Sequence, residues 1–214
     1  GGLDEEQRQI ATDIHHATEQ ASALASRLTG GARSHQPLEG TTDLALHVPS
    51  ISRMLNSLTR EEHQLTVDAE PTSLVVALHE SQVTQILTNL VANASHAIDG
   101  PGHIRVTVKR DDQGGELCAV LTVADDGCGM PPEVLARIFE PLYTTKGASV
   151  GTGLGLASVQ AILEERGGVV DVQSIPGEGT RFEFMFPSVG TCESPPAPSP
   201  RQYAGPRSRR ALVV

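Results

Sequence analysis

The chain has 214 residues, of which 38% are apolar and 3% aromatic, so it can form one domain of ordinary size with a core of Leu, Val, Ile and Ala. The formal net charge of −10 argues against a nucleic acid partner, because binding a phosphate backbone requires clustered Lys and Arg. Three cysteines, an odd number, argue against a disulfide framework and favour the reducing cytoplasm. The sequence leaves open whether a longer protein is attached to a membrane.

The first predicted element is a helix over residues 3–29, which carries two apolar series at heptad spacing. Two such series form a packing seam for a helical bundle or coiled coil, although a surface helix packed on its own domain gives the same pattern. Gly30 and Gly31 end the helix. The apolar positions are Leu3, Ile10, Ala17 and Leu24 in one series and Ile14, Ala21 and Leu28 in the other.

The next predicted elements are short until the clearest helix of the chain is reached. Residues 41–58 show a weak helical pattern that Pro49 interrupts, and short strands are expected near 64–68 and 73–78. Residues 81–98 carry apolar side chains at spacings of three and four, which predicts an amphipathic helix.

The second half of the predicted domain consists of two hairpins around a glycine-rich region. Alternating apolar residues predict a strand pair, then a helix, and then a second strand pair linked by a Pro-Gly-Glu-Gly turn. We therefore expect an α+β fold: a two-layer sandwich of a mostly antiparallel mixed sheet with helices on one face. The expected ranges are 103–110 and 117–124 for the first hairpin, 125–155 for the glycine-rich region, 156–166 for the helix, and 169–174 and 180–186 for the second hairpin.

Two asparagines, Asn89 and Asn93, lie four residues apart on the predicted helix over 81–98, so both side chains project from the same face. An amide oxygen is a suitable ligand for Mg²⁺, which prefers a few protein oxygens together with phosphates and waters. By itself such a pair is more typical of a solvated polar face.

The segment VADDGCGM, residues 123–130, places a carboxylate at the end of a predicted strand with two glycines after it. Asp125 can accept a hydrogen bond from an exocyclic amine such as that of adenine. Gly127 and Gly129 let the backbone turn sharply and approach a flat ligand closely. A plain acidic turn has the same composition.

Three alternating glycines, Gly151, Gly153 and Gly155, stand immediately before a predicted helix in the segment GTGLGL. Free backbone N–H groups and the positive end of the helix favour a bound phosphate there. The spacing is not that of a Rossmann dinucleotide site, and the Gly-Lys-Ser/Thr of a P-loop is missing. Lys146 is a candidate for phosphate contact, although an isolated lysine is more often a solvated surface residue, and GEGT at 177–180 is typical of a tight turn.

The order and spacing of these motifs are more specific than any one of them. Over residues 41–187 the chain reads N-x-x-x-N, D-x-G-x-G, F-E-P-L-Y-T-T-K, G-T-G-L-G-L and G-x-G-T. This series resembles the catalytic ATPase domain of two-component sensor histidine kinases, a branch of the superfamily shared with gyrase, the Hsp90 chaperones and MutL. The short segment between Lys146 and Gly151 is similar to the kinase branch. In place of the Asp that usually opens the Asn-bearing helix, this chain has His79-Glu80, so Ser81 is expected to cap the helix.

The resemblance implies that the domain binds ATP together with Mg²⁺. Asn93 would ligate Mg²⁺ and Asn89 would assist it, while Asp125 would bind the adenine amine. Gly127 and Gly129 would shape the base pocket. The other predicted ATP-binding residues are Lys146, Gly151, Thr152, Gly153, Leu154 and Gly155 around the lid over the phosphates, and Thr180 on the adenine side.

The resemblance also implies three parts. Residues 1–37 are similar to the second helix of the dimerisation and phosphotransfer hairpin, so the first helix with its phosphoacceptor histidine is expected upstream; His15 and His16 lack the acidic residue that follows an acceptor. Residues 38–187 would be the ATP-binding catalytic domain. Residues 188–214, rich in Ser, Pro and Arg before Ala-Leu-Val-Val, would be a flexible linker and the start of a truncated receiver domain.

The expected activity is that of a histidine autokinase in a two-component phosphorelay, which binds Mg-ATP and donates the γ-phosphate to a histidine of its own hairpin domain. The parent would be a hybrid kinase that forms a homodimer through its hairpin helices and works with a receiver domain or response regulator. Two alternatives stay open: an ATP-binding module without kinase activity, and a serine kinase of the anti-sigma-factor type. The heptad helix and the receiver-like tail count against the serine kinase.

Overall fold

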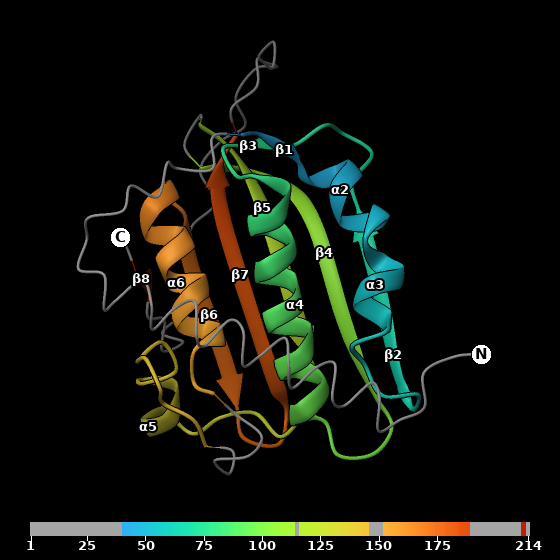
Figure 1. Cartoon of the computed structure of the whole chain (residues 1–214), viewed down its shortest axis with the longest axis vertical. Helices are drawn as coiled ribbons and strands as arrows, with labels where there is room; N and C mark the ends of the chain where they lie inside the picture. The colour runs from blue at the N-terminus through green and yellow to red at the C-terminus, as the bar shows by residue number, and fades with distance from the viewer. Residues whose placement is uncertain (1–39, 114–115, 146–151, 189–210, 213–214) are drawn as a thin grey trace.

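The described part of the chain consists of a mixed β-sheet with helices on one face and a small two-stranded sheet (Figure 1). The structure is a computed structural model that describes residues 40–113, 116–145, 152–188 and 211–212. The predicted helix over 3–29, and with it His15 and His16, lies outside the described residues. The elements are β1 (Thr42–Asp43), α2 (Leu44–Ser50), α3 (Ser52–Asn56), β2 (His63–Ala69), β3 (Val75–Val76), α4 (Glu80–Ala97), β4 (Gly102–Gln113), β5 (Glu116–Asp125), α5 (Pro132–Leu135), α6 (Gly155–Arg166), β6 (Val169–Ile175), β7 (Gly179–Pro187) and β8 (Ala211–Leu212).

The main sheet has the strand order β2-β4-β5-β7-β6-β8, and β1 pairs with β3 in a separate two-stranded sheet. Strands β2 and β4 run parallel, whereas every other neighbouring pair of the main sheet is antiparallel. Helix α4 lies over the middle of this sheet, with α6 beside it and with α2 and α3 toward the β2 edge (Figure 1). The α+β class and the mostly antiparallel sheet with helices on one face are therefore confirmed.

The core lies between the sheet and these helices. Phe182, Phe184 and Phe186 alternate along β7 and are buried on the face that α4 covers. From the other side, α4 contributes a buried stripe at spacings of three and four, and each buried Leu or Ile stabilises the fold by roughly 1.5–3 kcal/mol. The buried stripe consists of Val83, Ile86, Leu87, Leu90, Val91 and Ala94.

Helix α4 begins with a histidine cap. His79 has extended backbone angles (φ −73°, ψ 148°), its Nδ1 accepts the Ser81 N–H at 3.2 Å, and its own N–H donates to Gln82 Oε1 at 3.0 Å. This is a capping box in which an imidazole nitrogen takes the place of the usual oxygen. The expectation that Ser81 caps the helix is wrong, because Ser81 is already the second residue of the helix and its N–H is one of the groups that need a cap.

Other differences from the expected elements are local. The short helix α5 lies inside the glycine-rich region 125–155, for which no helix was predicted, and Pro132 stands in its first turn, where a proline is tolerated. Ser188, expected to begin the linker, still belongs to the folded part, since its N–H donates to the Leu117 carbonyl at 2.9 Å. Ala211–Leu212 pairs antiparallel with β6. Across the described ranges, no helix combines the length and the apolar character needed to cross a bilayer.

Candidate functional site

The ends of three strands meet at Asp125, the last residue of β5. Asp125 stands opposite Thr180 near the start of β7, and Thr180 in turn stands opposite Ser174 near the end of β6. Because cross-strand partners point to the same face of a sheet, these three side chains share the face that the helices cover. The register therefore places two predicted site residues, Asp125 and Thr180, side by side.

The Asp125 carboxylate is held by backbone donors. It accepts the Gly127 N–H at 2.9 Å and also the Thr180 N–H. Burial raises the pKa of the Asp125 carboxyl above its ordinary value; these two hydrogen bonds act to lower it, and the nearby charge of Asp126 adds to the rise. The site thus contains a half-buried acceptor whose negative charge costs solvation energy, which a donor on a ligand would offset.

The residues after Asp125 form a loop, here called the Asp125 loop (residues 126–130). Hydrogen bonds join this loop to the end of α4 and to the turn between β6 and β7. Cys128 donates its N–H to the Ala97 carbonyl at the end of α4 at 2.9 Å, and its own carbonyl accepts the Gly177 N–H at 2.8 Å. Met130 donates its N–H to Ser174 Oγ at 2.8 Å. The loop therefore spans from the last turn of α4 to the turn between β6 and β7.

The glycines of this loop are required by close backbone approach. A Cβ at Gly127 would lie 2.7 Å from the Ala97 carbonyl group, and one at Gly129, where φ is +63°, would overlap the Ile175 carbonyl. Gly179 approaches the backbone of Asp125 in the same way, with φ +100°. Only glycine fits these three positions without a shift of the backbone, which gives the predicted D-x-G-x-G pattern a steric reason.

The predicted asparagines lie on α4, one helical turn apart. Asn89 is next to the first residue of α6, because a Cβ at Gly155 would lie 3.1 Å from Asn89 Oδ1. Asn93 follows one turn further along α4, toward the Asp125 loop, and both side chains are half-buried. The structure thus brings Asn89 and the glycine segment together, although they are separated by more than 60 residues of sequence.

The segment before α6 is anchored to the FEPLY segment. Leu142 has a left-handed backbone (φ 65°), and its N–H donates to the Gly153 carbonyl at 2.9 Å. Gly153 also has φ +65°, and a Cβ there would overlap the Leu142 backbone. Thr152 Oγ1 accepts the Leu154 N–H at 3.3 Å, and Leu154 precedes the first helical residue. Lys146 and Gly151 lie outside the described residues.

Two residues of this region escaped the sequence analysis. Ser174 bonds to the Asp125 loop and to β7, a position that pairing the two expected strands 169–174 and 180–186 would have indicated. Asp126 accepts the His103 backbone N–H at 2.8 Å and lies 3.0 Å from His103 Nδ1. Partial burial acts to raise the pKa of Asp126, but these hydrogen bonds and the His103 charge hold it below its ordinary value.

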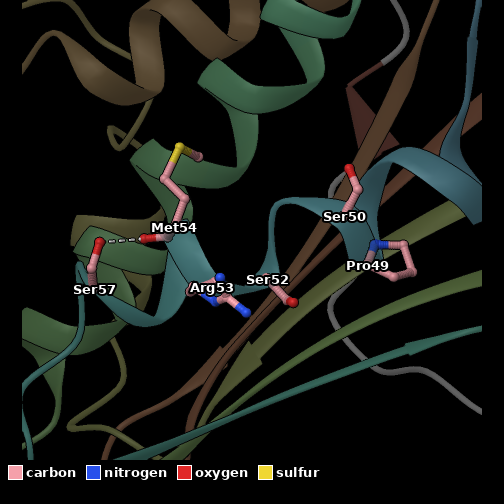
Figure 2. Close-up of a pocket in the computed structure, with 6 residues that line it drawn as sticks. All are labelled: Pro49, Ser50, Ser52, Arg53, Met54 and Ser57. Carbon is pink, nitrogen blue, oxygen red and sulfur yellow. Dashed lines mark hydrogen bonds between the residues drawn. The ribbon is translucent and has the colours of Figure 1, made fainter.

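A separate groove lies on the surface of α2 and α3 (Figure 2). One cationic side chain, Arg53, lines it, and the Ser57 hydroxyl donates to the Met54 carbonyl at 2.7 Å. None of the predicted site residues lines this groove, so it is distinct from the site at Asp125. Its lining residues are Pro49, Ser50, Ser52, Arg53, Met54 and Ser57.

Comparison with known protein families identifies the family of the domain. Residues 78–190 match the family of histidine kinase-, DNA gyrase B- and HSP90-like ATPases. This range contains α4, the Asp125 loop, the glycine segment and the β6–β7 turn. The chain belongs to this ATPase family. The expected resemblance is confirmed, and the domain is an ATP-binding domain of the kind found in histidine kinases.

Individual relatives of the ATPase domain agree with this assignment. The sensor histidine kinase ZraS of Klebsiella oxytoca is 42% identical over 126 residues, which are 59% of this chain and 26% of that protein. The catalytic domain of the histidine kinase ThkA has a TM-score of 0.59 at 26% identity, covering 70% of this chain and 95% of that domain. Full-length ShkA in complex with AMPPNP has a TM-score of 0.63 at 25% identity, covering 89% of this chain and 41% of that one. The matched part of this chain thus spans about a quarter of ZraS.

Proposed function

We propose that the protein is a histidine autokinase that binds Mg-ATP at the Asp125 site and donates the γ-phosphate to a histidine of its own hairpin domain. The observation that carries this proposal is the half-buried Asp125 carboxylate, held by the Gly127 and Thr180 N–H groups at the point where β5, β6 and β7 meet. It lies in a domain whose curated relatives are sensor histidine kinases.

The site has groups that suit both ends of ATP, the adenine base near Asp125 and the phosphates near the start of α6. Asp125 can accept a hydrogen bond from the exocyclic amine of adenine, which offsets the cost of its burial. The glycines of the Asp125 loop remove the side chains that would keep the base away from the backbone. At the other end, the backbone N–H groups at the start of α6 and its helix dipole favour phosphate. ShkA, which shares this fold, binds the ATP analogue AMPPNP.

The side chains between these two ends suit Mg²⁺. Asn89 and Asn93 offer amide oxygens on one side of α4, and Asn89 lies against the first turn of α6. Mg²⁺ binds through a few protein oxygens together with phosphate oxygens and waters, so two amides and a nucleotide suffice. The bound ion would neutralise phosphate charge during transfer. We propose Asn93 as the ligand, with Asn89 in support.

Removal of one amide tests the metal assignment. Asn93→Ala is expected to lose the Mg²⁺-dependent part of ATP affinity, while the affinity for adenosine stays nearly unchanged, because adenosine has no phosphate for the metal to join. Isothermal calorimetry with ATP and adenosine, with and without Mg²⁺, measures both. Thr88→Ala, one residue before Asn89 on α4, is a control that keeps the helix and both amides. An equal loss of adenosine affinity would contradict the metal role.

The partners and the place of the reaction are part of the same proposal. We infer a homodimer through hairpin helices, transfer onward to a receiver domain or response regulator, and a cytoplasmic catalytic domain. Histidine phosphate is labile in acid, whereas serine phosphate is stable. Incubation of a chain extended upstream to include the expected acceptor histidine with γ-labelled ATP, followed by acid treatment, therefore separates a histidine kinase from a serine kinase. Acid-stable label would contradict the proposal.

A further inference from the structure

Ser174, near the end of β6, joins three parts of the Asp125 site through one hydroxyl group. Its Oγ lies 2.8 Å from the Met130 amide nitrogen, 3.2 Å from the Gly179 carbonyl oxygen and 2.9 Å from Thr180 Oγ1. Met130 ends the Asp125 loop, while Gly179 and Thr180 open β7. One side chain therefore connects β6 with both of the segments that surround Asp125.

Counting protons assigns a direction to each of these hydrogen bonds. A serine hydroxyl has one proton and two lone pairs. The Met130 N–H can only donate, so it occupies one lone pair, and the Gly179 carbonyl can only accept, so it takes the proton. The contact with Thr180 then falls on the remaining lone pair. Thr180 must donate its own hydroxyl proton to Ser174, and this arrangement satisfies every donor and acceptor of Ser174.

The consequence for Thr180 is that its proton points toward β6. Thr180 is 7% exposed, so this hydroxyl has little access to solvent donors or acceptors. With its proton committed to Ser174, Oγ1 has only lone pairs left for a ligand. Thr180 stands opposite Asp125, whose carboxylate is also an acceptor. The two facing side chains would then present acceptors alone to a bound base.

We propose that Ser174 is a positioning residue that sets base specificity: it fixes the Thr180 hydroxyl as an acceptor and so favours adenine, with its exocyclic amine, over guanine, with a carbonyl at that position. This inference rests on the proposed function. The carbonyl of guanine would face acceptors without an intervening donor, and a buried polar edge left unpaired is the strongest source of discrimination that a binding pocket has.

The test is a double-mutant cycle on the ratio of ATP to GTP affinity. In Ser174→Ala, the Thr180 hydroxyl loses its acceptor and can rotate to donate to a carbonyl. We expect the ratio of ATP to GTP affinity to fall by about tenfold, the effect of one buried hydrogen bond. In a Thr180→Val background no hydroxyl remains to be positioned, so adding Ser174→Ala should leave the ratio unchanged. Ser188→Ala, at a half-buried serine whose hydroxyl donates to the Val75 carbonyl, is the matched control.

Each outcome separates positioning from a purely structural role. The inference is overturned if Ser174→Ala weakens the binding of ATP and the binding of GTP by the same factor. It is also overturned if Ser174→Ala changes the ratio of ATP to GTP affinity as much in the Thr180→Val background as in the wild type. If the wild type binds ATP and GTP equally, the inference fails and the proposed function stands; if it binds neither, both fail. If Ser174→Ala does not fold, two variants of Thr180 provide the test. Thr180→Ser is expected to keep the preference for ATP, whereas Thr180→Val is expected to lose it. The same ratio of ATP to GTP affinity in both variants would overturn the inference.

Discussion

The Asp125 carboxylate is the group on which base binding is expected to depend most. Asp125→Asn keeps the size of the side chain but removes the charge and replaces one acceptor oxygen with a donor. We predict that the free energy of ATP binding becomes less favourable by about 1–3 kcal/mol, the cost of losing a hydrogen bond to a charged, buried acceptor. Calorimetry with ATP measures it. Asp126→Asn is the matched control, because Asp126 is exposed and bonds to His103 instead. Equal ATP affinity in wild type and Asp125→Asn would contradict the adenine assignment.

The same carboxylate links stability to pH. Burial raises the pKa of Asp125 in the folded protein above its ordinary value of 3.8. When the pKa of a carboxyl is higher in the folded than in the unfolded protein, the group contributes stability at any pH below its unfolded-state pKa. This contribution is lost as pH rises through the folded-state pKa. At neutral pH the charged carboxylate therefore lowers the stability of the nucleotide-free domain. We predict that Asp125→Asn has the higher free energy of unfolding at neutral pH and that the difference narrows in acid, as measured by urea unfolding. A difference independent of pH would contradict this.

At the scale of residues, the sequence predicts some site positions and misses others for a physical reason. Asp125, Gly127 and Gly129 carry a pattern because backbone geometry restricts these positions to particular residue types. Ser174 carries none, because a serine fits most exposed or half-buried strand positions. Its importance comes from the register of β6 and β7, which decides what its hydroxyl meets.

Substitution of the two glycines at the ends of α6 distinguishes the effect of backbone strain from the effect of close packing. Gly153, before the helix, and Gly167, after it, both have φ +65°, but a Cβ at Gly153 would overlap the Leu142 backbone, whereas one at Gly167 meets nothing within 4 Å. We predict that Gly167→Ala costs about 1 kcal/mol of stability and leaves ATP affinity unchanged. Gly153→Ala should in addition weaken ATP binding, because Leu142 and the segment before α6 must move apart. Thermal unfolding and ATP calorimetry on both variants test this, and equal ATP affinities would contradict it.

The cap of α4 can be improved. His79→Ala removes the acceptor for the Ser81 N–H and is predicted to lower the free energy of unfolding by about 1 kcal/mol. His79→Asp restores an acceptor and adds a negative charge at the positive end of the helix, which is predicted to raise the free energy of unfolding by about 0.5 kcal/mol relative to wild type. Urea unfolding ranks the three proteins. If His79→Ala has the same free energy of unfolding as the wild type, the imidazole does not act as a cap.

At the scale of elements, the sequence predicts long periodic segments well and short ones poorly. Helix α4 was expected over 81–98 and runs over Glu80–Ala97, because its apolar stripe is long and regular. The four-residue helix α5 has too few turns to show a period, and the prolines at its N-cap and first position, Pro131 and Pro132, resemble those of a loop. The histidine cap was missed because imidazole is not among the usual capping groups.

The whole molecule derives its architecture from contacts that no local pattern contains. Binary patterns predict strands and helices, but the position of β2 beside β4, parallel and at the edge, follows from the resemblance to a known fold and from the structure. The same holds for the closeness of Asn89 to Gly155, which depends on how α4 and α6 pack against each other.

The core of the described residues runs from Leu44 to Phe186, so the ATP-binding unit should be separable. The nucleotide-free structure of the ThkA catalytic domain matches 70% of this chain over 95% of its own length. Among the described residues, removal of β8 would take away the two strand pairs that Ala211 and Leu212 form with β6.

We therefore predict that a protein of residues 40–188 unfolds cooperatively and binds ATP with an affinity within about threefold of that of the chain 1–214, since changes away from the site alter free energies by about 0.5 kcal/mol. Calorimetry and thermal unfolding of both proteins provide the test, with residues 40–214 as the control for β8. A tenfold loss of ATP affinity in 40–188 but not in 40–214 would mean that residues 189–214, which include β8, support ATP binding. A loss in both would place part of the ATP site before residue 40.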